Sequence, residues 1–116
     1  MTLELLLLRH AKSSWSDPST TDHERPLNDR GRRTAPRMGR LTRTLDRLPD
    51  LVLSSDARRT RETVDLWRTG AEWDGEIQWS SELYHASAET LAAAAASAGP
   101  VRRLMLVAHN PGLEDF

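Results

Sequence analysis

The sequence predicts an α/β fold, a three-layer sandwich in which a mostly parallel central sheet has helices on both faces. Short apolar segments alternate with longer segments of helical periodicity along the whole chain. No internal repeat and no linker-like stretch interrupts this alternation, and the length of 116 residues suits one domain. We therefore expect a single domain over residues 1–116, with consecutive strands joined by crossover helices.

The first expected strand spans Leu3–Leu8 and is continuously apolar after Glu4, a pattern typical of a strand covered on both faces. Residues 11–27 are polar and rich in turn-forming residues, so they are expected to form one long loop without structure of its own. Loops of this length are usually functional.

The first expected helix begins after a cap at Asn28 or Asp29 and runs to about Leu48. Its apolar residues recur at helical spacing and predict a buried stripe made of Met38, Leu41, Leu45 and Leu48. Pro36 should kink this helix or mark its true start, because proline lacks the N–H that a helix interior needs.

The second strand is expected at Leu51–Ser55, after a proline. The helix that follows is expected over Ala57–Thr69 and should stop at Gly70. Val64 and Trp67 are expected to face inward from this helix.

The last third of the chain predicts two strands and one helix. Ile77 and Trp79 indicate a short third strand. Ser87 is expected to cap an alanine-rich helix that ends at Gly99–Pro100, and Leu104–Ala108 reads as another buried strand.

Composition excludes several classes of protein. The chain has no cysteine, so disulfides, thiolate metal sites and cysteine nucleophiles are impossible. With 38% hydrophobic and 28% charged residues, it is typical of a globular protein. The apolar run Leu5–Leu8 is too short for a membrane span or a signal peptide, so we expect a cytoplasmic protein with no membrane partner.

Charge is unevenly distributed along the chain. Residues 1–47 carry an excess of basic side chains and residues 48–116 an excess of acidic ones, while the net charge is only −1. The basic half favours an anionic ligand. No aromatic residues alternate with a basic strip, and the isoelectric point of about 6.4 argues against a nucleic-acid partner.

Basic residues and histidines follow three of the expected strands. Arg9 and His10 follow the first strand, Arg59 lies near the start of the helix after the second, and His109 and Asn110 follow the last. Because ligands of parallel sheets bind beyond the carboxyl ends of the strands, these residues indicate one site.

The chemistry of this predicted site is that of an oxyanion. Arginine forks match phosphate oxygens, and a helix N-terminus adds unpaired N–H groups. The positive charge of neighbouring arginines disfavours protonation of an imidazole, so His10 is expected to be neutral and able to act as a nucleophile. Asp56 is the one acid expected nearby. Two histidines without a carboxylate make a poor metal site, so we expect no metal ion and no other cofactor.

Five motifs resemble those of a known family. They are LLLLRHAKSSW (5–15), ERPLNDRG (24–31), SSDARRTRET (54–63), ELYHAS (82–87) and VAHNPG (107–112). Their order and residue types are similar to the histidine phosphatase superfamily, and in particular to its SixA-type phosphohistidine phosphatase branch. The resemblance covers nearly the whole chain and implies a phosphoglycerate-mutase-like fold.

The resemblance assigns roles to individual residues. His10 corresponds to the nucleophile that becomes phosphohistidine, and Arg9 and Arg59 correspond to the arginines that clamp the phosphoryl group. Arg59 is chosen over Arg58 because the family pattern places its arginine four residues before a threonine, here Thr63.

The resemblance also implies supporting residues. His109 corresponds to a second catalytic histidine that donates a hydrogen bond to a phosphoryl oxygen, and Arg25 to a further phosphate-binding arginine. Asn110 is expected to shape the binding loop. Lys12 and Ser13 are expected to help position phosphate, with simple surface solvation as the alternative.

The chain departs from the family pattern at three places. Ala11 stands where many members of the wider superfamily have glycine, a change that is normal for this branch. Asp56 stands where members usually have proline, which puts a negative charge near the expected anion site. The chain stops at Phe116, whereas family members continue with a further helix and usually a strand. We therefore expect a truncated domain in which an exposed edge could support an oligomer.

The resemblance implies a metal-independent phosphatase that hydrolyses phosphohistidine or phosphomonoesters through a covalent intermediate on His10. Its partner would be a phosphorylated protein or a small phosphate ester. Glu82 is the candidate acid for ester cleavage, with an ordinary solvated glutamate as the alternative. Without a clear acid, the chain favours phosphohistidine. A non-catalytic phosphate-binding or regulatory module and a phosphosugar mutase-like enzyme are the alternative functions.

Overall fold

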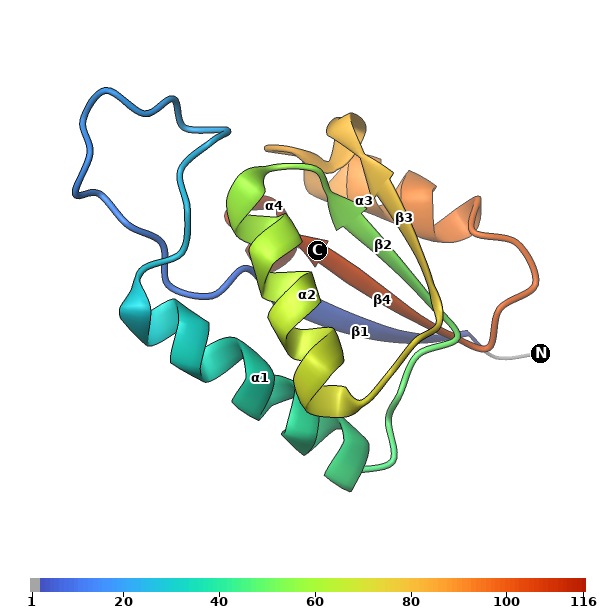
Figure 1. Cartoon of the computed structure of the whole chain (residues 1–116). Coiled ribbons are helices and arrows are strands. Elements are labelled where there is room, and N and C mark those ends of the chain that lie inside the picture. Colours follow the sequence, from blue (N-terminus) through green and yellow to red (C-terminus); the bar gives the residue numbers. More distant parts are fainter. Residues whose placement is uncertain (1–2) are drawn as a thin grey trace. The chain divides into compact units, whose positions relative to one another are not determined.

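The computed structural model describes residues 3–116 (Figure 1). The chain divides into two compact units. The sheet unit contains the residues up to Arg9 together with Pro49–Asp56 and Gly75–Phe116. The helical unit contains His10–Leu48 and Ala57–Asp74. The expectation of a single domain over residues 1–116 stays a prediction.

The sheet unit is built on four parallel strands in the order β1-β4-β2-β3 (Figure 1). They are β1 (Glu4–Arg9), β4 (Arg103–Ala108), β2 (Leu51–Ser55) and β3 (Glu76–Ser80). Crossover connections between parallel strands are the signature of an α/β fold. The predicted fold class is therefore confirmed.

Strand β1 is less buried than its sequence predicts. It stands at the edge of the sheet beside β4, and Leu7 is 45% exposed. By contrast, every residue of the inner strand β2 is buried. The prediction that β1 is covered on both faces is wrong among the described residues, because an apolar run does not distinguish an edge strand from a central one.

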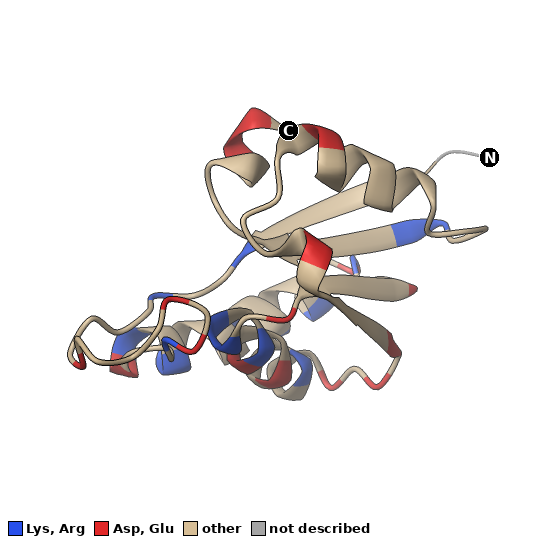
Figure 2. Ribbon diagram, turned by 90° about the horizontal axis from the view of Figure 1, so that it is seen from above, with Lys and Arg blue, Asp and Glu red and all other residues tan. Residues whose placement is uncertain are grey.

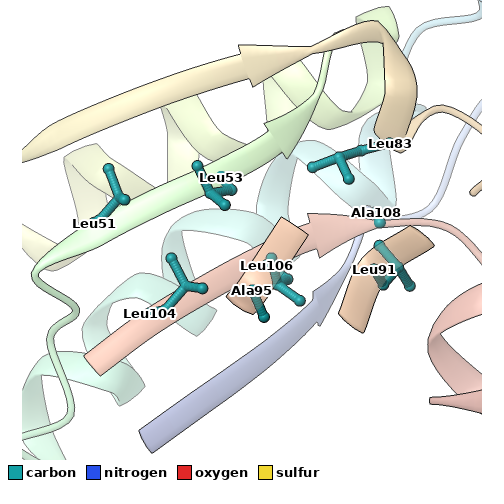
Figure 3. Packing of buried hydrophobic residues seen from close by; sticks show 8 residues of the cluster. All are labelled: Leu51, Leu53, Leu83, Leu91, Ala95, Leu104, Leu106 and Ala108. Carbon is teal, nitrogen blue, oxygen red and sulfur yellow. The ribbon is translucent and has the colours of Figure 1, made fainter. Parts of the chain in front are cut away.

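The core of the sheet unit lies between the strands, the 3₁₀ turn η1 (Ser81–Leu83) and helix α3 (Ala88–Ala96) (Figure 3). Its buried members are Leu51, Leu53, Leu83, Leu91, Ala95, Leu104, Leu106 and Ala108. The Ser87 hydroxyl accepts a hydrogen bond from the Thr90 N–H, which confirms the predicted cap. The helix ends at Ala96, earlier than the predicted Gly99–Pro100. A short helix α4 (Gly112–Asp115) follows β4.

The helical unit is formed by α1 (Asp29–Thr44), α2 (Arg58–Ala71) and the loop before α1. The two helices approach so closely that a Cβ on Gly39 would lie 2.0 Å from the Trp67 carbonyl oxygen. A Cβ on Gly70 would lie equally close to the carbonyl oxygen of Pro36, at 2.0 Å. Gly70 therefore lies inside α2, and the prediction that it stops the helix is wrong.

The face of α1 that is buried differs from the predicted one. Its buried residues are Gly31, Ala35 and Gly39, whereas Met38, Leu41 and Leu45 are exposed. The helix runs through Pro36 and ends at Thr44, short of the predicted end at Leu48. The predicted leucine stripe is wrong because the backbone of α2 lies too close for larger side chains. Figure 2 shows basic residues recurring along both helices.

The loop over residues 11–27 is closed at its base. Ser13 and Leu27 form an antiparallel bridge, and the Ser14 N–H donates to the Pro26 carbonyl at 2.8 Å. The Lys12 carbonyl accepts from the Asn28 N–H at 2.9 Å. The prediction of a long loop is confirmed, but its two ends are paired. No helix among residues 3–116 is long and apolar enough to cross a membrane.

Candidate active site

Two hydrogen-bond partners within the helical unit fix the tautomer of His10. Its Nδ1 lies 2.7 Å from the Ala11 carbonyl oxygen, which can only accept, so Nδ1 carries the proton. Its Nε2 lies 3.3 Å from Nε of Arg59, which can only donate, so Nε2 carries the lone pair. This hydrogen-bond pattern describes a neutral imidazole whose basic nitrogen faces a guanidinium.

Arg59 is positioned by the first turn of α2, and its side chain is only 3% exposed. Besides its contact with His10, it donates from Nη1 to the Asp22 carbonyl oxygen at 2.5 Å. Its Nη2 lies 3.1 Å from the Asp22 carboxylate. One edge of the guanidinium therefore faces His10 and the other faces Asp22.

Asp22 also pairs with a second arginine. Nη2 of Arg25 lies 3.3 Å from the other carboxylate oxygen of Asp22. The Arg25 guanidinium stacks on the Trp15 ring at 3.7 Å and donates from Nη1 to the Ser13 hydroxyl. The prediction that Asp56 is the one acid near the arginines is therefore wrong, because Asp22 joins Arg25 and Arg59.

Thr63 fixes the backbone beside His10. Its hydroxyl accepts from the Ala11 N–H at 3.0 Å and donates to the Arg59 carbonyl at 2.7 Å. Ala11, whose carbonyl holds Nδ1 of His10, is thus tied through its N–H to the helix that carries Arg59. The first N–H of this helix, that of Arg58, donates to the His23 carbonyl at 2.9 Å. This helix N-terminal donor is therefore occupied by a backbone carbonyl of the protein.

Sequence reasoning missed the roles of Asp22 and of the Thr63 hydroxyl. Asp22 lies three residues before Arg25, a spacing at which opposite charges often pair, but the link to Arg59 is a tertiary contact. The spacing between Arg59 and Thr63 is a helical one that allows the hydroxyl to reach back to a carbonyl.

The sheet unit holds the second predicted histidine. His109 follows β4, is 3% exposed, and its Nε2 lies 2.9 Å from the Ser55 hydroxyl at the end of β2. The rings of Tyr84 and His85 each make a T-shaped contact with its ring, at centroid distances of 5.5 Å and 5.6 Å. Arg9 is exposed at the end of β1.

The remaining predicted residues have local partners. The side-chain amide of Asn110 donates to the Glu114 carboxylate at 2.9 Å, and the Asn110–Pro111 peptide bond is cis. Glu82 is exposed in η1, where its backbone N–H donates to the Ser80 hydroxyl. Lys12 is exposed at its side chain.

The helical unit thus brings together part of the predicted site. Its contacting members are His10, Arg59, Arg25 and Ser13, joined by Asp22. Arg9, His109, Asn110 and Glu82 belong to the sheet unit. Within residues 3–116 no three histidine or acidic side chains are grouped to hold a metal ion. The catalytic and binding roles of all these residues, and the expected absence of a metal, stay predictions.

Comparison with known sequences identifies the family. The profile of the histidine phosphatase superfamily (branch 1) matches residues 5–84. An uncharacterised chloroplastic protein of Arabidopsis thaliana is 47% identical over 74 residues, which are 64% of this chain and 33% of the plant protein. An uncharacterised protein of Mycobacterium tuberculosis is 37% identical over 105 residues, which are 90% of this chain and 63% of that protein. The chain therefore spans less than two thirds of the length of these relatives.

Comparison with solved structures gives the branch. The proposed phosphohistidine phosphatase SixA from Agrobacterium tumefaciens superposes with a TM-score of 0.91 and 36% identity. The match covers 98% of this chain and 73% of the Agrobacterium chain. The parallel sheet and its helices follow the phosphoglycerate-mutase-like α/β fold of these structures. The chain belongs to the histidine phosphatase superfamily, within its SixA-type branch.

Proposed function

We propose that this chain is a phosphatase that hydrolyses phosphohistidine through a covalent phosphoryl group on His10. The observation that carries the proposal is the tautomer of His10, whose unprotonated Nε2 faces the buried guanidinium of Arg59. A neutral imidazole is a nucleophile, and a guanidinium beside it stabilises the charge that develops on phosphoryl oxygens. Membership of the superfamily and the likeness to the proposed phosphohistidine phosphatase of Agrobacterium tumefaciens support this assignment.

In the first step, the lone pair on Nε2 of His10 attacks phosphorus and the P–N bond of the substrate breaks. The leaving imidazole keeps the electron pair of that bond. It departs as a neutral ring, because its other nitrogen is protonated before cleavage. Arg59, which loses its acceptor on Nε2, then donates to the phosphoryl oxygens. The Ala11 carbonyl stabilises the positive imidazole of the adduct through Nδ1–H.

In the second step, water attacks phosphorus and the bond to Nε2 breaks. The electron pair returns to Nε2, and the protons of water end on the phosphate product and on solvent. His10 is thereby restored to its starting tautomer. From the resemblance alone, we propose that Arg9 clamps the phosphoryl group and that His109 donates a hydrogen bond to a phosphoryl oxygen. An alanine variant of each residue tests these two roles separately.

The test is the rate of phosphate release from phosphohistidine and from p-nitrophenyl phosphate. His10→Ala should reduce both rates to the level of buffer, because no other group replaces the nucleophile. His23→Ala is the matched control, since His23 lies in the same unit with its side chain beside Glu24 and should keep full activity. Activity of the His10→Ala variant at the normal rate would refute the nucleophile.

The choice between substrate classes can be tested at Glu82. An alkyl phosphate ester such as glycerol 2-phosphate needs an acid to protonate its leaving oxygen, whereas p-nitrophenolate and the imidazole of phosphohistidine leave without one. Glu82→Gln should therefore leave phosphohistidine hydrolysis unchanged. A fall in the rate on the alkyl ester alone would identify Glu82 as the acid, and wild-type rates on both phosphohistidine and the alkyl ester would leave it as a solvated side chain. A chain that binds phosphate but releases no product from either substrate would be a binding module.

A further inference from the structure

The carboxylate of Asp22 pairs with the terminal nitrogens of two arginines that the resemblance assigns to phosphate. One carboxylate oxygen lies 3.1 Å from Nη2 of Arg59 and the other lies 3.3 Å from Nη2 of Arg25. This is the arrangement in which two guanidinium groups hold two oxygens of one anion. Here the anion is a side chain of the protein itself.

The three side chains differ in burial. The Arg59 side chain is 3% exposed and that of Arg25 is 10% exposed, whereas Asp22 is 40% exposed. The arginines are thus fixed within the unit, while the carboxylate is the member open to solvent. Asp22 also lies in the loop 11–27, outside any helix or strand. The carboxylate is therefore the part that can leave.

We propose that the Asp22 carboxylate competes with phosphoryl groups for Arg25 and Arg59, and that an incoming phosphoryl group displaces it. The inference rests on the proposed function only in assigning these arginines to phosphate. A site that is closed by its own carboxylate binds anions more weakly, by the fraction of molecules in which it is open. The same carboxylate, on returning, would help to expel the phosphate product.

The two arginines have other contacts that hold them in place without the Asp22 carboxylate. The Asp22 backbone carbonyl also holds Nη1 of Arg59, at 2.5 Å, and that contact does not depend on the side chain. Arg25 is held independently by the Trp15 ring and the Ser13 hydroxyl. Loss of the carboxylate charge should therefore leave both arginines in place and open to an anion.

The two roles predict opposite signs. If Asp22 competes, its removal strengthens anion binding. If its carboxylate is needed to orient the arginines, its removal weakens anion binding. A measurement of binding, rather than of turnover, distinguishes them directly.

The experiment is calorimetric titration of the full chain with tungstate, a tetrahedral dianion, and with inorganic phosphate, at fixed ionic strength. Asp22→Asn and Asp22→Ala should each bind both anions about tenfold more tightly, as expected if the closed form is about nine-tenths populated. Asp17→Asn is the control, because it removes the same charge from the same loop, where the Asp17 carboxylate accepts from Ser19. The control should bind like the wild type.

Unchanged or weaker binding in both Asp22 variants would overturn the proposal, and so would an equal gain in Asp17→Asn, which would reflect net charge alone. Failure to bind either anion, in the wild type and both variants, would overturn it as well. Because the readout is binding, a chain without turnover still tests it. Normal turnover with unaltered binding in the Asp22 variants would refute this inference and leave the proposed function intact.

Discussion

Replacing Thr63 by valine removes one hydroxyl and keeps the shape of the side chain. That hydroxyl accepts from the Ala11 N–H at 3.0 Å and donates to the Arg59 carbonyl at 2.7 Å. Thr63 is buried, so water cannot easily replace the lost group. The substitution therefore tests whether the peptide next to His10 is held by α2.

The magnitude follows from the two contacts. Loss of the acceptor leaves the Ala11 N–H without its partner, which costs about 1–3 kcal/mol. Loss of the donor costs less, because the Arg59 carbonyl lies in α2 and keeps its helical hydrogen bond. We expect the free energy of unfolding to fall by about 2 kcal/mol. A shift of the Ala11 peptide would also misalign His10, and a displacement of about 1 Å can lower kcat about 100-fold.

The assay is urea denaturation together with the rate of phosphohistidine hydrolysis. Thr63→Ser is the control, since it keeps the hydroxyl and should recover most of the activity that Thr63→Val loses. A Thr63→Val variant with wild-type stability and wild-type kcat would refute the reasoning. A variant that loses stability while keeping kcat would show that the contact supports the fold and not the nucleophile.

Two further predictions concern packing and pH. Gly39→Ala gains about 1 kcal/mol of helix propensity, but its Cβ would lie 2.0 Å from the Trp67 carbonyl. We expect its free energy of unfolding in chemical denaturation to fall by about 1–3 kcal/mol. The control Arg40→Ala, at an exposed position of the same helix, should stay near the wild-type value. A Gly39→Ala variant more stable than the wild type would contradict the close helix contact. The Ser19 hydroxyl and N–H lower the pKa of Asp17 below its ordinary value of 3.8. Its contribution to stability is complete above that pH and is lost as the pH falls through the lowered pKa. An NMR titration of Asp17 at or above 3.8 would contradict this.

Strand positions were the part of the fold most open to prediction from the sequence. The segment Leu51–Ser55 is continuously apolar and β-prone before it turns polar, and its bounds are confirmed. Its burial, by contrast, comes from its two neighbours in the sheet, β4 and β3. Leu7 shows the limit of this reasoning, since its exposure depends on the position of β1 at the sheet edge.

The helical unit was harder to predict because small residues, rather than large apolar ones, form its contact. Gly31, Ala35 and Gly39 recur every four residues and mark the buried face of α1. A hydrophobic pattern gives weight to leucine and none to glycine, so it selects the exposed face. Gly70 misled for the same reason, because close approach and helix termination both favour glycine.

The sequence also indicates some residues of the candidate site and not others. Strand ends and motifs selected His10 and Arg59 as candidates, and the two side chains are in contact in the helical unit. Asp22 escaped notice because nothing in a polar loop indicates which acid will fold onto an arginine 37 residues away. Local sequence predicts which functional residues follow the end of a strand. It does not predict how a long loop closes.

Chemical mapping of the phosphorylated enzyme tests the central claim most directly. The chain is mixed with phosphoramidate, quenched in alkali to preserve phosphohistidine, digested and analysed by mass spectrometry. We predict one phosphorylated peptide, which carries the phosphoryl group as a label on Nε2 of His10. This label should be lost after acid treatment. Release of phosphate with the label on another residue, or with no label under single-turnover conditions, would contradict the account.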